Sequence, residues 1–188
     1  PDFTQMQQRG TTAATAARDH TVKVVVEDLQ PGETYYYRFR VGEVVSEPGR
    51  TRTLPAGPLA QLGIAIASCS NYPFGFFNAY EIIANDADID FVLHLGDYLY
   101  EYGADGWGAA EGAAIGRAHA PAHEIVSLQD YRERHAQYKT DLGSRLMHAA
   151  HPLISTWDDH ESSNNPWLGG AQNHQPDTEG DWRTRRDA

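Results

Sequence analysis

The stretch that decides the fold is Phe91-Val92-Leu93-His94-Leu95-Gly96-Asp97-Tyr98-Leu99-Tyr100-Glu101. It opens with a short apolar run, which predicts a buried strand. Gly96 then allows the backbone to turn and leave the sheet. Asp97 is therefore expected at the carboxyl end of the strand, which is where open α/β sheets bind their ligands.

Two other apolar runs, 61–68 and 153–157, are predicted to be strands that also end beside metal-binding residue types. Helical patterns lie between the runs, so the expected order is strand, helix, strand, long loop 103–126, helix, strand. Right-handed crossovers would make the three strands parallel, with helices covering the sheet. All three carboxyl ends then meet at one edge, which gathers five residues of interest: Cys69, Asp97, Tyr100, Asp159 and His160.

The first part of the chain has the alternating pattern of antiparallel β-structure. Strands are predicted over 21–27, 34–41 and 49–53. The sequence Leu29-x-Pro31-Gly32-x-x-Tyr35 resembles the turn and tyrosine corner of fibronectin type III domains. We therefore expect residues 1–54 to be the C-terminal part of a fibronectin III-like β-sandwich, with a simple β-meander as the alternative. Residues 55–60, rich in Pro and Gly, are predicted to be a linker to a second domain over 61–188.

The charge balance limits the range of partners. The 188 residues include 26 acidic and 15 basic side chains, which give a formal net charge of −11. Such a chain is a poor general ligand for nucleic acid or for an anionic membrane, because both carry the same sign. A small anionic substrate remains compatible, since a bound metal ion dominates its local field. The single cysteine excludes an internal disulfide, and no apolar run approaches the roughly 20 residues of a membrane helix.

The residues at the first two strand ends suit a transition metal. Cys69 as a thiolate would be a good ligand, although a lone cysteine is more often a buried apolar residue. Asp97 could give one oxygen to each of two cations, or could simply cap the next turn. Tyr100 could bind only as a phenolate, which requires a strong Lewis acid such as iron(III). Otherwise it is a packed aromatic residue.

The segment Asp158-Asp159-His160-Glu161 is dense in ligand types, and Asn164 and Asn165 follow it closely. The histidine could be a metal ligand, a general acid or a donor to a phosphoryl oxygen, and a solvated acidic turn is the alternative. An asparagine carbonyl oxygen suits calcium, but asparagine is also common in turns. Of the other histidines, His94 and His135 are expected to be packing residues, while three lie in polar loops and receive no role: His119, His123 and His174.

Taken together, four motifs resemble the PhoD-type alkaline phosphatases, a family of the calcineurin-like metallophosphoesterases. Related iron-dependent phospholipase D enzymes share these motifs, and the resemblance runs from about residue 20 to the end. The motifs are Ser68-Cys69-Ser70-Asn71-Tyr72, His94-Leu95-Gly96-Asp97-Tyr98-Leu99-Tyr100-Glu101, Tyr131-Arg132-x-x-His135-x-x-Tyr138 and Trp157-Asp158-Asp159-His160-Glu161-x-x-Asn164-Asn165.

The resemblance implies an α/β metallophosphoesterase-like sheet with covering helices, preceded by part of an all-β fibronectin type III-like domain. It implies a site with iron(III) and calcium, in which Cys69, Asp97 and Tyr100 hold the iron and Asp97 bridges to calcium. Asp159 and Asn164 are candidate calcium ligands, which of Asp159, Asn164 and Asn165 binds calcium stays open, and His160 is the expected catalytic residue. Two such cations would clamp a phosphate ester and activate a bound water. The implied activity is hydrolysis of small phosphate esters in the extracellular or periplasmic space.

One departure from the family pattern is clear. The superfamily completes its metal site with later ligands, and this chain ends at Ala188 without a convincing candidate for them. We therefore expect an internal fragment of a larger enzyme, with little activity alone. Two other functions stay open: a phospholipase D-like phosphodiesterase, and a non-catalytic cell-surface binding module that combines a fibronectin-like unit with a degenerate domain.

Overall fold

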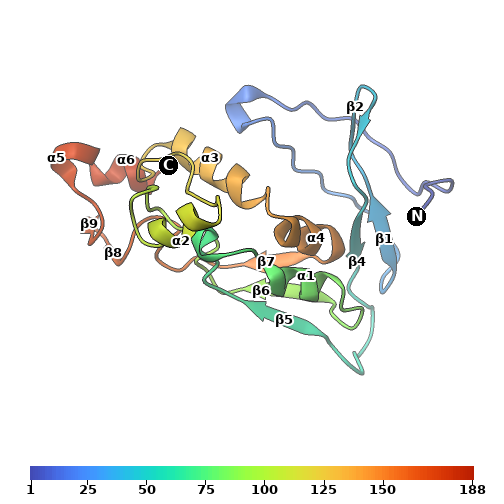
Figure 1. Cartoon of the computed structure of the whole chain (residues 1–188). Helices are drawn as coiled ribbons and strands as arrows, with labels where there is room; N and C mark the ends of the chain where they lie inside the picture. The colour runs from blue at the N-terminus through green and yellow to red at the C-terminus, as the bar shows by residue number, and fades with distance from the viewer. The chain divides into compact units, whose positions relative to one another are not determined.

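The computed structural model describes all residues, 1–188, and the chain divides into two compact units, Pro1–Gln61 and Leu62–Ala188 (Figure 1). Each unit is described by itself. None of the helices has the length and apolar character needed to cross a membrane.

The first unit contains two short antiparallel ladders and one turn of 3-10 helix. β1 (Thr34–Tyr37) pairs with β4 (Gly49–Arg52), and β2 (Arg40–Val41) pairs with β3 (Val44–Val45). The 3-10 turn is η1 (Ala16–Arg18). The hydroxyl of Tyr35 accepts a hydrogen bond from the Gln30 N–H at 2.8 Å, which closes the turn before β1.

Two strand predictions for this unit need correction. Residues 21–27 belong to no strand, because they pair with no neighbouring segment, and an alternating pattern forms a strand only where a ladder partner exists. The single strand predicted over 34–41 is two strands, since β1 and β2 pair with different partners and the chain changes ladder between them.

The second unit is built on a parallel sheet of three strands, as the sequence predicts. β5 (Ile64–Ala67), β6 (Phe91–His94) and β7 (Leu153–Ser155) lie in that order, with β6 in the centre. Val92 of β6 is fully buried and packs with Tyr80 and Met147. Ile66 and Ile154 lie in register on either side of Leu93 and are exposed.

Helices lie over the face of this sheet that carries Val92 (Figure 1). α1 (Asn78–Ala84) packs against α4 (Leu142–Ala150), and α3 (Leu128–Tyr138) begins at a capping box in which Ser127 and Asp130 bond reciprocally. A second core forms around Leu99, Ile125 and Tyr138. The remaining elements are short: η2 (Tyr72–Phe74), α2 (Ala109–Ala114), β8 (Pro166–Trp167), β9 (Gly170–Ala171), α5 (Pro176–Glu179) and α6 (Trp182–Arg186). α2 corrects the prediction of a loop without regular structure over 103–126; its alanines favour a helix.

Candidate metal centre

The first two strand ends turn in the same way and bring Cys69 beside Asp97. Both residues have left-handed backbone angles, with φ of 57° and 51°. The pairing continues past the strands, because the Cys69 N–H donates to the Gly96 carbonyl at 3.1 Å and the Ser70 N–H donates to the Asp97 carbonyl at 2.9 Å. The Cys69 Sγ consequently lies 3.5 Å from Asp97 Oδ2.

Gly96 allows the loop after β7 to reach the same place. Its φ is 105°, and a Cβ added there would lie 2.3 Å from the Asp158 nitrogen and 2.6 Å from the Asp158 Cβ. Only glycine tolerates both that backbone angle and that close approach. As a result, the His160 N–H reaches Asp97 and donates to its Oδ1 at 3.2 Å.

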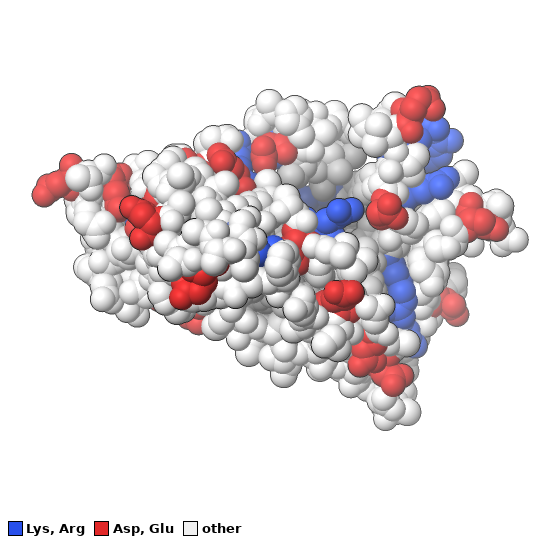
Figure 2. All heavy atoms as spheres, in the orientation of Figure 1, with Lys and Arg blue, Asp and Glu red and all other residues white.

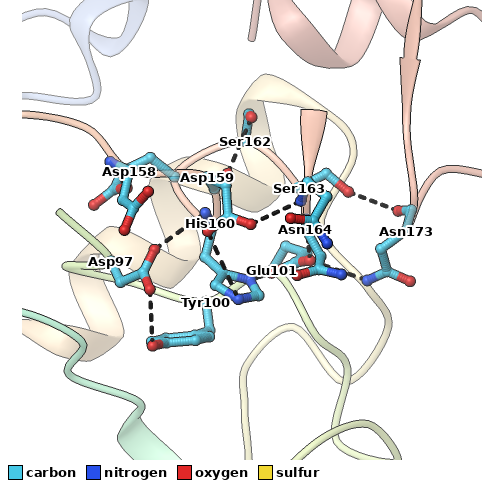
Figure 3. Close-up of polar contacts among 12 residues, drawn as sticks. Asp97, Tyr100, Glu101, Asp158, Asp159, His160, Ser162, Ser163, Asn164 and Asn173 are labelled. Carbon is cyan, nitrogen blue, oxygen red and sulfur yellow. Dashed lines mark hydrogen bonds and ion pairs between the residues drawn. The ribbon is translucent and has the colours of Figure 1, made fainter. Parts of the chain in front are cut away.

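Asp97 is the centre of this arrangement (Figure 3). Its Oδ2 also accepts a hydrogen bond from the Tyr100 hydroxyl at 3.0 Å. Burial raises the pKa of the Asp97 carboxyl above its ordinary value, because it disfavours the charged form. Burial, together with the nearby Asp97 charge, also raises the pKa of Tyr100 well above that of a free tyrosine. A cation at this position would oppose both effects.

Three residues meet the geometric requirement for a metal site in this structure. One donor atom each from Asp97, Asp159 and His160 lies within 4.8 Å of the others. The Cys69 thiol and the Tyr100 hydroxyl border this group through Asp97. The donor set therefore combines sulfur, nitrogen and phenol oxygen, which suit a transition metal, with carboxylate oxygens, which also suit calcium.

His160 is oriented by Glu101, a residue to which the sequence analysis assigns no role. Glu101 is fully buried, and its Oε2 lies 2.6 Å from the His160 Nδ1. Its Oε1 accepts the Asn164 N–H at 2.8 Å and the Asn173 side-chain N–H at 3.0 Å (Figure 3). Glu101 lies four residues after Asp97 in the sequence. Its partners His160, Asn164 and Asn173 are distant in the sequence, so the sequence alone does not reveal these contacts.

The pKa values of the pair follow from these contacts. Burial would raise the pKa of Glu101, but the hydrogen bonds from His160, Asn173 and Asn164 outweigh it and hold that pKa below its ordinary value. Burial would lower the pKa of His160, but the Glu101 carboxylate outweighs it and raises that pKa above its ordinary value. The imidazole is thus held with its Nδ1 toward Glu101, and its Nε2 lies 4.0 Å from Asp159 Oδ1.

The asparagines lie at the margin of the group. The side-chain amides of Asn164 and Asn165 donate to Gln172 Oε1 at 3.1 and 2.6 Å. The Asn165 backbone N–H donates to Asp159 Oδ2 at 2.7 Å, which fixes the Asp159 carboxylate. The segment therefore supports Asp159 through its backbone.

The other histidines of the motifs and loops have partners away from the site. His94 is buried and bonds to the Tyr80 hydroxyl at 2.8 Å, and His135 stacks on Tyr98, so both are packing residues as predicted. Among the loop histidines, His119 bonds to the Tyr138 hydroxyl, His123 pairs with Asp130, and His174 pairs with Glu179.

Comparison with known proteins matches both parts of the chain to one family. Residues 64–188 match the family model described as PhoD-like phosphatase, and residues 1–55 match the one described as PhoD-like phosphatase, N-terminal domain. The chain is 44% identical over 165 residues to alkaline phosphatase D of Bacillus subtilis (strain 168), which covers 87% of this chain and 28% of that protein. A solved structure described as "Structure of PhoD" matches with a TM-score of 0.83 and 40% identity, over 92% of this chain and 33% of the other. The chain thus spans about a third or less of the length of these relatives.

Proposed function

Because the chain belongs to the PhoD-like phosphatase family, we propose that it carries part of the active site of a metal-dependent phosphoric ester hydrolase. The observation that carries this proposal is the meeting of donor atoms from Asp97, Asp159 and His160 at one sheet edge, with Cys69 and Tyr100 bordering it. Those side chains come from three separate strand ends, and a purely structural turn would not need all of them.

We assign iron(III) to Cys69, Asp97 and Tyr100, and calcium to Asp97, Asp159 and an asparagine carbonyl, with Asn164 ahead of Asn165. Sulfur and phenol ligands favour a transition metal, and the raised pKa of Tyr100 calls for a strongly acidic ion to remove its proton. Oxygen ligands favour calcium. When bound, such ions neutralise phosphoryl oxygens and lower the pKa of a bound water.

Within this site His160 acts as the proton donor. Its raised pKa favours the protonated imidazolium, and Glu101 holds the Nδ1 side of the ring. The Nε2 proton is then available to a phosphoryl oxygen or to the leaving ester oxygen, as general acid catalysis requires. Asp97 also helps to position His160, because its Oδ1 accepts a hydrogen bond from the His160 backbone N–H.

We also carry the domain assignment forward as a proposal. Residues 1–54 would be part of a fibronectin III-like domain, 55–60 its linker and 61–188 the first part of the catalytic domain. The Tyr35–Gln30 hydrogen bond supports the tyrosine corner. The family resemblance supports hydrolysis of small phosphate esters outside the cytoplasm. Acidic side chains are spread over the face seen in Figure 2, which disfavours broad binding of nucleic acid.

The test is metal content together with phosphate ester turnover, on the full-length protein and on residues 1–188. We expect iron and calcium in the full-length protein, hydrolysis of phosphate monoesters or diesters, and much less activity from residues 1–188. Asp97→Asn should remove most of the metal and reduce turnover by at least about 100-fold, since it takes away the shared ligand. Asp88→Asn, which changes the same charge in the turn before β6, should have no such effect. A folded protein without metal or turnover would instead favour the binding module.

A further inference from the structure

A chain of aromatic rings leads from the candidate metal centre to an exposed tryptophan. The ring of Tyr100 lies 4.3 Å from that of His160, centroid to centroid. Trp107 lies 5.6 Å from Tyr100 and 6.2 Å from Tyr102, and Tyr102 itself lies 5.5 Å from His160. The ring of Trp107 also lies 4.8 Å from that of Phe74, centroid to centroid. Neither Trp107 nor Phe74 has a role in the proposed mechanism.

The indole of Trp107 is partly exposed and has no flat-stacked neighbour. All three neighbouring rings meet it at steep interplanar angles, 56° for Tyr100, 72° for Tyr102 and 75° for Phe74. None of them stacks flat upon it, and the residue is 54% exposed. The short distances between the rings leave no room for a ligand among them. A bound group would therefore lie over the indole.

Glycines on both sides hold Trp107 in this place. A Cβ at Gly106 would lie 2.7 Å from the Tyr102 Cβ, so a larger residue would push the segment away from Tyr102. Gly108 has a φ of 90°, and its Cβ position lies 3.2 Å from Pro73 Cβ and 3.5 Å from the Phe74 ring. The Gly-Trp-Gly sequence is thus fitted closely against Tyr102 and against η2, which carries Phe74.

We propose that Trp107, backed by Phe74, forms a subsite for a planar aromatic group on the phosphate ester. The inference rests on the proposed function, since the phosphoryl group must bind near Asp97 and His160. An aryl ring joined to the ester oxygen would then extend past the buried Tyr100 and stack on the exposed indole. Aromatic stacking of this kind contributes about 0.5–1.5 kcal/mol beyond area burial, which is roughly a 2- to 13-fold preference.

The experiment compares kcat/KM for three substrates in the full-length enzyme: 1-naphthyl phosphate, glycerol phosphate and phosphocholine. The wild type should prefer the naphthyl ester after correction for leaving-group reactivity with an alkaline phosphatase that lacks an aromatic subsite. Trp107→Ala should reduce the naphthyl-to-glycerol ratio about 3- to 10-fold, mainly through KM, and Trp107→Phe should restore much of it. Trp167→Ala is the matched control, because Trp167 is 59% exposed and has no aromatic ring contact. It should leave the ratio unchanged.

The outcomes separate the two proposals. If the wild type hydrolyses none of the esters, the proposed function fails and the subsite fails with it. If the wild type hydrolyses them but Trp107→Ala changes kcat/KM for the naphthyl and glycerol esters by the same factor, the proposed phosphoesterase function is kept and the aromatic subsite is refuted. A Trp107-dependent preference for phosphocholine alone would also refute it, since the indole face would then bind a cation.

Discussion

The substitution Glu101→Gln tests how the site controls His160. Glu101 is fully buried, and its two oxygens accept three hydrogen bonds, from His160, Asn164 and Asn173. Glutamine keeps the shape but has one accepting oxygen. If that oxygen retains the two asparagine donors, the amide NH₂ faces the His160 Nδ1. The imidazole must then become neutral, with its proton on Nε2.

The magnitude follows from the bonds that are lost. A hydrogen bond to a charged group contributes about 1.5–3 kcal/mol, so the free energy of unfolding should fall by about that amount. For a protein of this size the Tm should drop by about 3–12 °C. In the variant, burial is left unopposed, so the pKa of His160 should move from above its ordinary value to below it. Loss of the imidazolium as proton donor should reduce kcat about 100- to 10,000-fold at neutral pH.

The assay combines thermal unfolding, the pH profile of kcat/KM and an NMR titration of His160 in metal-free protein. Glu124→Gln is the control, because Glu124 pairs with Arg185 at 2.7 Å and its loss changes the same charge outside the site. It should affect stability but leave the His160 titration in place. A Glu101→Gln protein whose His160 titrates as in the wild type would refute the orienting role of Glu101.

Two further predictions concern the fold around the site. Gly96→Ala should lower the free energy of unfolding by about 3 kcal/mol or more, because the new Cβ would lie 2.3 Å from the Asp158 nitrogen. Gly116→Ala is the control: its Cβ would have no atom within 4 Å, so only its φ of 70° should cost stability, by about 1 kcal/mol. Equal losses of stability in urea unfolding would contradict this prediction. Burial, aided by the charge of Arg134, lowers the pKa of His119 to about 3, so this histidine stays neutral in the folded protein, while in the unfolded chain it takes up a proton near pH 6.5. Between pH 7 and pH 5 the free energy of unfolding should therefore fall by about 2 kcal/mol more in the wild type than in His119→Gln. Identical pH dependence of the two proteins in urea unfolding would refute this prediction.

The strand ends could be predicted from sequence because their signals are local. An apolar run followed by a turn locates Asp97 and Cys69, and the chain order determines that both lie at one edge of a parallel sheet. The meeting of Asp97, Asp159 and His160 at one edge of the sheet is expected from that topology. Family resemblance added the choice of metals, which no contact in the structure tests.

What could not be predicted depends on distant partners. Glu101 and Asn173 are 72 residues apart and contact each other only because the segment after β7 folds back over the site. The alternation over 34–41 gives no sign that the chain changes ladder between β1 and β2. The placement of Trp107 depends on two glycines whose close contacts exist only in the folded structure.

The proton positions around Asp97 connect metal binding with pH. Its Oδ2 accepts a hydrogen bond from the Tyr100 hydroxyl, and the Cys69 Sγ lies 3.5 Å from the same oxygen. A cation that binds Asp97 together with Tyr100 would have to displace the phenol proton, because a tyrosine coordinates as its phenolate. Because burial raises the pKa of Tyr100, metal binding through its phenolate should strengthen as the pH rises.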